Sequence, residues 1–440
     1  MSDTSRKKVG VISLGCDKNR VDTEKMLAIL SEKFQITTDV EQSKILIINT
    51  CAFLNASRKE AIEEIISAIL LKEQNKVEKI IVTGCLPQKF IDEIFDQLIE
   101  VDAFLGVSDY DKILEVIDRI YKGERVNAVG TPKGEPGIKR VLTTNNYAYL
   151  KIADGCDNHC TYCLIPKIRG KFRSVPSKDL IEEAKSLGEI KELVLVAQDT
   201  TRYGFDLNNG ENIVSLVREL SKLKNILGIR LLYCYPENIT DELINEFTVN
   251  SKMIRYIDIP FQHADNGVLK LMGRKGSKEE YLSLIDKLRN RVKGIAIRST
   301  FITGFPSESD EAFENLVDFL NRAKLNNAGF FKYSREKDTP ADRLDGHLKE
   351  GIKSQRLKKL YSVQKKIVKQ NNKKLIGKSF SVLAEGFDYQ QLIYYGRAYF
   401  NAPDVDGRIL FFSAEPVKYG EHVSVKIVKA SGYDLIGERQ

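Results

Sequence analysis

Short apolar runs alternate with helical patterns over the first third of the chain. Ile45–Ile48 is a continuous apolar run, which is typical of a strand buried on both faces. The predicted strands are Val9–Leu14, Ile45–Ile48 and Lys79–Val82, and the predicted helices are Val21–Phe34, Ala56–Leu71 and Gln88–Ile99. This alternation predicts an N-terminal open parallel α/β sheet with helices on its faces.

A Gly- and Pro-rich segment, Asn127–Thr144, interrupts this pattern and is predicted to be a linker. A second alternating series follows it. Its predicted strands are Tyr149–Ala153, Leu193–Ala197, Ile229–Cys234, Ile257–Phe261, Ala296–Ile302 and Gly329–Tyr333, with helices at Lys178–Leu187, Lys278–Arg291 and Asp310–Ala323 among them. Six strand–helix units predict a partial (β/α)6 barrel, in which the active site lies at the carboxyl ends of the strands.

The last part of the chain has a different pattern. Lys353–Lys374 is predicted to be a basic amphipathic helix, with Leu357 and Leu360 on its apolar stripe. The segment Phe380–Val428 is rich in Val, Ile, Phe and Tyr and is interrupted by Gly and Pro, which predicts a small antiparallel β-barrel. We therefore expect three domains, at residues 1–138, 139–374 and 375–440.

Composition excludes several classes of protein. The chain has 440 residues, of which 42% are apolar and 29% charged, as in ordinary globular proteins. No stretch reaches the roughly 18 consecutive apolar residues of a membrane span. The apolar run after the polar N-terminus is too short for a signal peptide. We therefore expect a cytoplasmic protein without a membrane partner.

Positive charge is concentrated in one segment. The net charge is +7, and residues 353–374 carry nine Lys or Arg and no acidic residue, so removing these nine leaves the remainder at −2. Residues 375–440 have seven basic and eight acidic residues, a net charge of −1, which suits a basic protein partner better than RNA. The basic helix could contact RNA phosphates, or could be the solvated face of a connecting helix.

Seven cysteines in a reducing compartment point to metal or redox chemistry. Cys156, Cys160 and Cys163 lie within eight residues after a predicted strand, so their thiolates can converge on one metal site. A zinc site would need a fourth ligand, for which His159 inside the loop is the nearby candidate. A [4Fe–4S] cluster on three thiolates leaves one iron open, and this Cys-x3-Cys-x2-Cys spacing is the signature of radical S-adenosylmethionine (SAM) enzymes.

Three further cysteines each follow a predicted strand of the N-terminal sheet. Cys16, Cys51 and Cys85 are separated by 35 and 34 residues, about one strand–helix unit. Parallel strands bring their carboxyl ends to one edge of the sheet, so these thiols are predicted to meet there and hold a second cluster. The alternative is three unrelated core cysteines. Cys234 has no partner at such spacing and is expected in the core.

The chain as a whole resembles the MiaB/RimO family of methylthiotransferases, which are radical SAM enzymes. The resemblance extends from Val9 to about Ile436, and the tail resembles a TRAM domain. The motifs that carry it are Gly15-Cys-Asp-Lys-Asn-Arg20, Asn49-Thr-Cys51, Thr83-Gly-Cys-Leu86, Ile165-Pro166 and Arg169-Gly-Lys171. Two residues depart from the family pattern, Asp17 in place of a common Pro and Ser307 in place of a Gly.

The resemblance implies two [4Fe–4S] clusters and SAM as cofactors. The cluster on Cys156, Cys160 and Cys163 would bind SAM and cleave it to a radical that abstracts hydrogen from an unactivated carbon. The cluster on Cys16, Cys51 and Cys85 would hold the sulfur to be inserted, and a second SAM would methylate it. Both clusters would face one cavity, and an electron donor and a sulfur donor would be needed.

Within the family, the chain is more similar to the RimO branch. The segments that suggest this are Val196-Ala-Gln-Asp-Thr-Thr-Arg-Tyr-Gly204, Tyr233-Cys-Tyr-Pro236 and Phe331-Lys-Tyr-Ser-Arg335. RimO enzymes modify the β-carbon of one aspartate in the twelfth protein of the small ribosomal subunit, so that protein, free or in the subunit, is the expected partner. The alternatives are a tRNA adenosine methylthiotransferase of the MiaB type and a non-catalytic iron–sulfur or zinc module that docks on RNA or the ribosome.

A SAM pocket is predicted from polar and turn residues at the ends of two barrel strands, where ligands commonly bind. Turn chemistry and helix capping are the alternative explanation for such residues. The candidate SAM-binding residues are Gln198, Asp199, Arg298, Thr300, Gly304 and Pro306.

Overall fold

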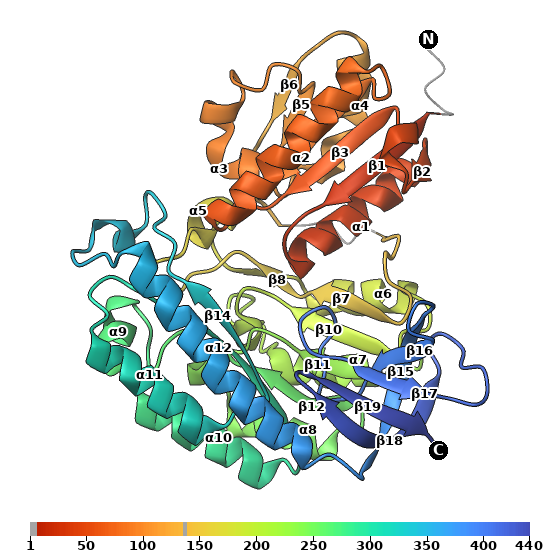
Figure 1. The fold of residues 1–440 in the computed structure, drawn as a ribbon. Helices are drawn as coiled ribbons and strands as arrows, with labels where there is room; N and C mark the ends of the chain where they lie inside the picture. The colour runs from red at the N-terminus through yellow and green to blue at the C-terminus, as the bar shows by residue number, and fades with distance from the viewer. Residues whose placement is uncertain (1–6, 135–138) are drawn as a thin grey trace.

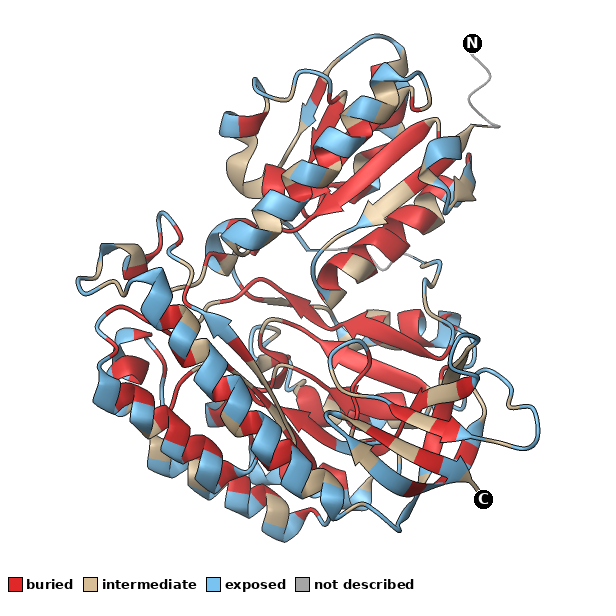
Figure 2. Ribbon diagram, in the orientation of Figure 1, coloured by how far each residue is buried: buried red, intermediate tan, exposed pale blue. Residues whose placement is uncertain are grey.

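The computed structural model describes residues 7–134 and 139–440 and contains three large β-structures and one small two-stranded sheet, joined by helices (Figure 1). Two of the large β-structures are six-stranded parallel sheets, and the third is a closed five-stranded barrel. Figure 2 shows that the strands of both sheets are largely buried, whereas the covering helices expose one side. The predicted α/β class, with a partial barrel and a small C-terminal β-barrel, is confirmed. None of the described helices is both long and apolar enough to span a membrane.

The N-terminal sheet has the strand order β2-β1-β3-β4-β5-β6. Its strands are β1 (Lys8–Ser13), β2 (Gln35–Thr37), β3 (Ile45–Thr50), β4 (Lys79–Gly84), β5 (Ala103–Leu105) and β6 (Val126–Ala128). Its helices are α1 (Asp17–Ser31), α2 (Asn55–Glu73), α3 (Cys85–Ile94) and α4 (Ile113–Tyr121). Apolar side chains of α2 and α3 pack on one face of the sheet, and those of α1 and α4 pack on the other, so β3 is buried on both sides.

The central sheet has the order β14-β13-β12-β11-β10-β7, and all its strands are parallel. Its strands are β7 (Tyr147–Lys151), β10 (Glu192–Val196), β11 (Ile229–Leu231), β12 (Met253–Asp258), β13 (Ala296–Thr303) and β14 (Asn327–Lys332). The short strands β8 (Ala153–Asp154) and β9 (Arg173–Ser174) pair beside it. Its helices are α5 (Ile165–Arg169), α6 (Ser177–Ser186), α7 (Ile213–Ser221), α8 (Asp241–Val249), α9 (Asn266–Leu271), α10 (Lys278–Arg291) and α11 (Asp310–Ala323).

The long helix α12 (Glu350–Lys373) leads to the C-terminal barrel. It packs against β14 and α11 with Leu360 and Ile367 buried. Two of its basic residues, Lys353 and Arg356, are buried in ion pairs rather than solvated. The barrel strands are β15 (Ser379–Asp388), β16 (Ile393–Arg397), β17 (Ile409–Phe412), β18 (His422–Ser431) and β19 (Asp434–Arg439).

Some predicted element boundaries were wrong. The predicted strand Ile257–Phe261 lies earlier, at Met253–Asp258, and Pro260 beyond its end lacks the N–H that a continuing strand would need. Helix α1 begins at Asp17 rather than at Val21, directly after Cys16. The predicted domain boundary after residue 138, like part of the predicted linker, falls outside the described residues.

Buried charges join the N-terminal sheet to the central sheet. Lys151 in β7 forms an ion pair with Asp22 of α1. The guanidinium of Arg169 in α5 lies 3.1 Å from Oδ2 of Asp22 in α1 and 2.8 Å from Oδ2 of Asp154 in β8, so it links elements that flank the two sheets. All four side chains are at most 10% exposed. Removing one charge from such a network leaves its partner buried and uncompensated, so the network holds the two sheets in one arrangement.

A second buried cluster joins the central sheet to the barrel. Glu192, the first residue of β10, accepts hydrogen bonds from Arg230 Nε at 2.5 Å and from Arg397 Nη1 at 3.0 Å, and Arg397 ends β16 of the barrel. Burial alone would raise the pKa of Glu192, but the two guanidiniums outweigh it and lower the pKa to about 2. Its ionised form therefore stabilises the docked barrel.

We predict that Glu192→Gln lowers the free energy of unfolding at pH 7 by about 3 kcal/mol, because two buried guanidiniums lose their counter-charge. The pKa of Glu192 in the folded protein is below the ordinary value of 4.5 that it has in the unfolded chain, so this contribution is complete above about pH 4.5 and is lost as the pH falls toward 2. Urea unfolding between pH 7 and 3, with exposed Glu219→Gln as the control, measures both effects. Equal stability and equal pH dependence in Glu192→Gln and wild type would contradict this role.

Candidate functional site

The three N-terminal cysteines lie at one edge of their sheet, as their spacing predicts. Cys16 follows β1, Cys51 follows β3 and Cys85 follows β4, and these three strands are consecutive neighbours in the sheet. Cys51 and Cys85 are buried, whereas Cys16 is exposed. The parallel register therefore gathers three thiols at the carboxyl edge, with one of them open to a ligand.

A glycine in the first cysteine motif permits this convergence. Gly15 has φ +89°, and a Cβ added to it would lie 2.6 Å from Cys51 Cβ. Any side chain here would push apart the loops that carry Cys16 and Cys51, and the left-handed conformation also favours glycine. The Gly-Cys pair in the motif is therefore a packing requirement of the triad.

The environment of these thiols favours their neutral form when no metal is bound. Burial raises the pKa of Cys51, and the neighbouring Cys16 raises it further. Burial raises the pKa of Cys85 to about 12, although the Arg169 guanidinium opposes that rise. Metal ligation requires thiolates, so loading this triad would release protons.

The second triad lies on the loop after β8, at the carboxyl edge of the central sheet. Cys156 and Cys160 are buried and Cys163 is partly buried, whereas the His159 side chain is exposed. The backbone N–H of Asn158 donates to Cys156 Sγ, and that of Ile165 donates to Cys163 Sγ, each at 3.4 Å. Burial raises the pKa of Cys156 to about 11. The loop thus supplies three sulfur ligands and N–H donors to them.

Cys160 is held by two residues of the central domain that the sequence analysis did not single out. Its Sγ lies 3.9 Å from Tyr235 Oη and 3.9 Å from Arg274 Nη1. Arg274 also stacks on the Tyr235 ring, 4.1 Å from its centroid. These contacts place a positive charge and an aromatic ring beside this sulfur.

Arg169 brings the two triads into one network. It follows Cys163 by six residues, and its side chain is 1% exposed. Its Nη2 donates to Asn19 Oδ1 at 2.6 Å and lies 3.9 Å from Cys85 Sγ. The segment that follows the central triad in the sequence therefore contacts the N-terminal triad through the side chain of Arg169.

Two predicted SAM-pocket residues lie against the central cysteine loop. Asp199, fully buried, accepts hydrogen bonds from Asn158 Nδ2 at 3.1 Å and from Thr201 Oγ1 at 2.7 Å, and burial raises its pKa. Gln198 donates to Asp154 Oδ1 at 3.0 Å, and its buried Oε1 accepts no hydrogen bond from the described residues. Asp199 therefore contacts the cysteine loop through Asn158, and Gln198 contacts Asp154 just before that loop. The Oε1 atom of Gln198 remains available to accept a hydrogen bond.

The other predicted SAM-pocket residues make different contacts. Arg298 donates to Asp258 Oδ1 at 2.9 Å and to Thr300 Oγ1 at 3.5 Å. Gly304 has φ +75°, and a Cβ on it would lie 2.4 Å from Lys353 Cγ. The glycine therefore allows this turn to pack closely against α12. Pro306 is buried in the same turn. SAM binding stays a prediction for all six candidate residues, Gln198 and Asp199 included.

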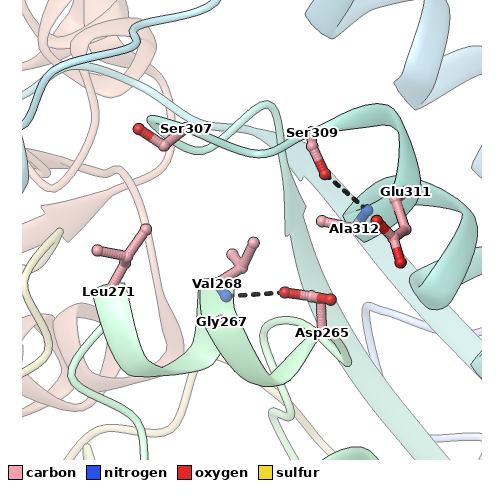
Figure 3. Close-up of a pocket in the computed structure, with 8 residues that line it drawn as sticks. All are labelled: Asp265, Gly267, Val268, Leu271, Ser307, Ser309, Glu311 and Ala312. Carbon is pink, nitrogen blue, oxygen red and sulfur yellow. Dashed lines mark hydrogen bonds between the residues drawn. The ribbon is translucent and has the colours of Figure 1, made fainter.

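Figure 3 shows a surface pocket of about 350 Å³ between α9 and α11. Asp265 Oδ1 accepts the N–H of Val268, and Ser309 Oγ accepts that of Ala312, each at 3.0 Å, so these polar groups cap the two helices. None of the predicted site residues lines this pocket. It is therefore separate from both cysteine triads.

The donor chemistry of both triads suits iron–sulfur clusters, which are held by Cys thiolates. Within residues 7–134 and 139–440, no group of three His, Cys, Asp or Glu side chains is arranged to hold a single metal ion. A cubane cluster binds each thiolate through a different iron, so its ligands stand farther apart than those of one ion. The soft, all-sulfur donor set of each triad fits such a cluster.

Arg169 and Arg274 were missed as functional residues because their partners are distant in sequence. The only available signal for Arg169 was its place in the Arg169-Gly-Lys171 motif. Arg274 has no such signal: its contact with Cys160 spans 114 residues. Only the folded chain shows that both cations lie beside cysteine sulfurs.

Family models match three parts of the chain. Residues 8–106 match a family described as Uncharacterized protein family UPF0004, residues 150–320 match the Radical SAM superfamily, and residues 376–439 match the TRAM domain. The structure resembles that of the cobalamin-dependent S-adenosylmethionine radical enzyme OxsB, with a TM-score of 0.52 at 14% identity, covering 82% of this chain and 56% of OxsB. This likeness supports the radical SAM fold.

Curated relatives match nearly the whole chain. The ribosomal protein uS12 methylthiotransferase RimO of Clostridium botulinum (strain Eklund 17B / Type B) is 46% identical over 436 residues, which cover 98% of this chain and 97% of that protein. The protein of the same name from Acetivibrio thermocellus is 45% identical over 447 residues, covering 98% of each chain. The chain belongs to the RimO family of radical SAM methylthiotransferases.

Proposed function

We propose that this protein inserts a methylthio group at the β-carbon of an aspartate in ribosomal protein uS12. The observation that carries the proposal is the pair of cysteine triads at the carboxyl edges of two parallel sheets, joined through Arg169. A C–H bond is replaced by a C–S bond in this reaction, so the radical source and the sulfur source must act on the same carbon. The full-length likeness to RimO proteins supports the choice of uS12.

The six cysteines have separate roles in this proposal. Cys156, Cys160 and Cys163 would hold the cluster that binds SAM, and Cys16, Cys51 and Cys85 would hold the second cluster. When bound, these groups supply the electron that cleaves SAM and the sulfur that is inserted. The exposed position of Cys16 leaves that cluster's site accessible.

The surrounding residues position these ligands. Asp199 holds Asn158, which lies between Cys156 and Cys160, and so fixes the shape of the central loop. Arg274 places a cation beside Cys160, and Arg169 places one beside Cys85. A cation near a thiolate stabilises its charged form, which both triads need in order to bind iron.

A basic strip on α12 supports docking to the assembled subunit. Seven of the nine basic residues in the predicted helix are exposed: Lys358, Lys359, Lys365, Lys366, Lys369, Lys373 and Lys374. Such a strip suits RNA phosphates, so we infer that it contacts ribosomal RNA. The proposal also requires an external one-electron reductant and a sulfur donor to renew the second cluster.

The direct test is a competition under anaerobic conditions. Reconstituted protein, SAM and a reductant are given small ribosomal subunits and unmodified tRNA together, and mass spectrometry identifies the methylthiolated product. We expect the group on an aspartate of uS12. Modification of tRNA adenosine would overturn the proposed substrate, and SAM cleavage without modification of either would overturn the assignment to these two substrates.

Single cysteine variants separate the two triads. We predict that Cys160→Ala abolishes SAM cleavage, because the central cluster loses a ligand. Cys51→Ala keeps SAM cleavage and loses methylthio insertion. Cys234→Ala, which alters the core cysteine outside both triads, is the matched control and should retain both activities. Anaerobic product analysis measures these outcomes, and SAM cleavage by Cys160→Ala at the wild-type rate would exclude its assigned role.

A further inference from the structure

Lys18 is a buried cation between the two triads. It follows Cys16 by two residues in the first turn of α1, and it is 7% exposed. Its Nζ lies 3.4 Å from the centroid of the Tyr233 ring, which belongs to the segment after β11 of the central sheet. Two residues further on, Tyr235 contacts Cys160. Lys18 and the segment from Tyr233 to Tyr235 therefore span the space from one triad to the other.

Lys18 differs in its partners from the other cations of this interface. Arg169 pairs with Asp22 and Asp154, and Arg298 pairs with Asp258. In each case the carboxylate lies on a different strand or helix from the arginine with which it pairs. The carboxylate partner of Lys18 among the described residues is its neighbour Asp17, at 2.9 Å.

The bonding capacity of Lys18 is incompletely used. An ammonium has three N–H donors, and Asp17 accepts one of them. The Tyr233 ring stabilises the charge through a cation–π contact but accepts no conventional hydrogen bond. A nearly buried ammonium with donors to spare is suited to receive a second carboxylate, because desolvation strengthens that attraction.

Tyr233 supplies a second free donor at the same place. Across the two described ranges of the chain, its hydroxyl has no hydrogen-bond partner. Tyr233 has φ +58°, a left-handed conformation that is uncommon for a bulky residue and that clusters at ligand sites. Its N–H donates to Asp258 Oδ2 at 3.2 Å, which helps to hold this strained position.

We propose that Lys18, assisted by the Tyr233 hydroxyl, binds the side-chain carboxylate of the substrate aspartate. This inference rests on the proposed function and adds the residue that recognises the target side chain. Holding that carboxylate between the triads would fix the β-carbon, which is one bond away, at the place where C–H cleavage and C–S formation must meet. Lys18 is thus a substrate-binding residue that distinguishes aspartate from asparagine.

The test measures binding rather than turnover. Reconstituted holoenzyme is titrated by calorimetry with uS12 that carries either the natural aspartate or an asparagine at the target position. We expect wild type to prefer aspartate by at least about tenfold, the lower end for a buried charge pair. Lys18→Met should bring that preference close to one while affinity for the asparagine form is kept. The control, Lys33→Met, removes an exposed lysine just beyond the same helix and should keep the preference.

The outcomes separate this inference from the proposed function. A preference retained in Lys18→Met would overturn the role of Lys18 and leave methylthiolation of uS12 standing. Equal loss of affinity for both forms would assign Lys18 a structural role and also overturn it. A wild-type protein without preference would exclude charge recognition of the aspartate. The proposed function itself fails only on the product analysis of the competition experiment.

Discussion

The guanidinium of Arg169 between Asp22 and Asp154 is the contact on which the proposed site depends. A buried guanidinium is stable only when carboxylates compensate its charge. Here one carboxylate, Asp22, comes from α1 beside the N-terminal sheet, and the other, Asp154, comes from β8 beside the central sheet. Arg169 can therefore stay buried only if the N-terminal and central sheets are docked. Because the same side chain follows the central cysteine loop and reaches Cys85, this electrostatic requirement also sets the relation between the two triads.

Parallel topology explains why both triads lie at this interface. Each sheet brings the loops after its strands to its carboxyl edge, and each triad lies on such loops. The C-terminal barrel is held by separate charges, with Glu192 between Arg230 and Arg397. Its aspartates also reach the interface: Asp404 pairs with Arg20 of α1, and Asp406 lies 3.6 Å from Arg298. All three domains thus contribute charges to the contacts between them, some buried, such as Asp406 with Arg298, and some exposed, such as Asp404 with Arg20.

The local pattern of apolar residues predicted the strands and the position of the cysteines that follow them. Ile45–Ile48 reads as a buried strand because every residue is apolar, and Cys51 could be placed at a sheet edge because it follows that strand. Contacts between distant segments could not be predicted in this way. Arg169 forms an ion pair with Asp22, which is 147 residues away in the sequence. Gly304 packs against Lys353 of α12, and nothing in the sequence around Gly304 indicates that contact. The partners of charged residues depend on how the domains are arranged, and the spacing of apolar residues along the chain does not predict that arrangement.

The central claim is that both cysteine triads hold clusters within one docked assembly. Iron and sulfide content after anaerobic reconstitution tests it most directly, in wild type and in two triple variants that change either Cys16, Cys51 and Cys85 or Cys156, Cys160 and Cys163 to Ala. The account predicts that each triple variant holds half the iron of wild type. Full iron content in either variant would contradict the claim, since the altered triad would then not be a cluster site.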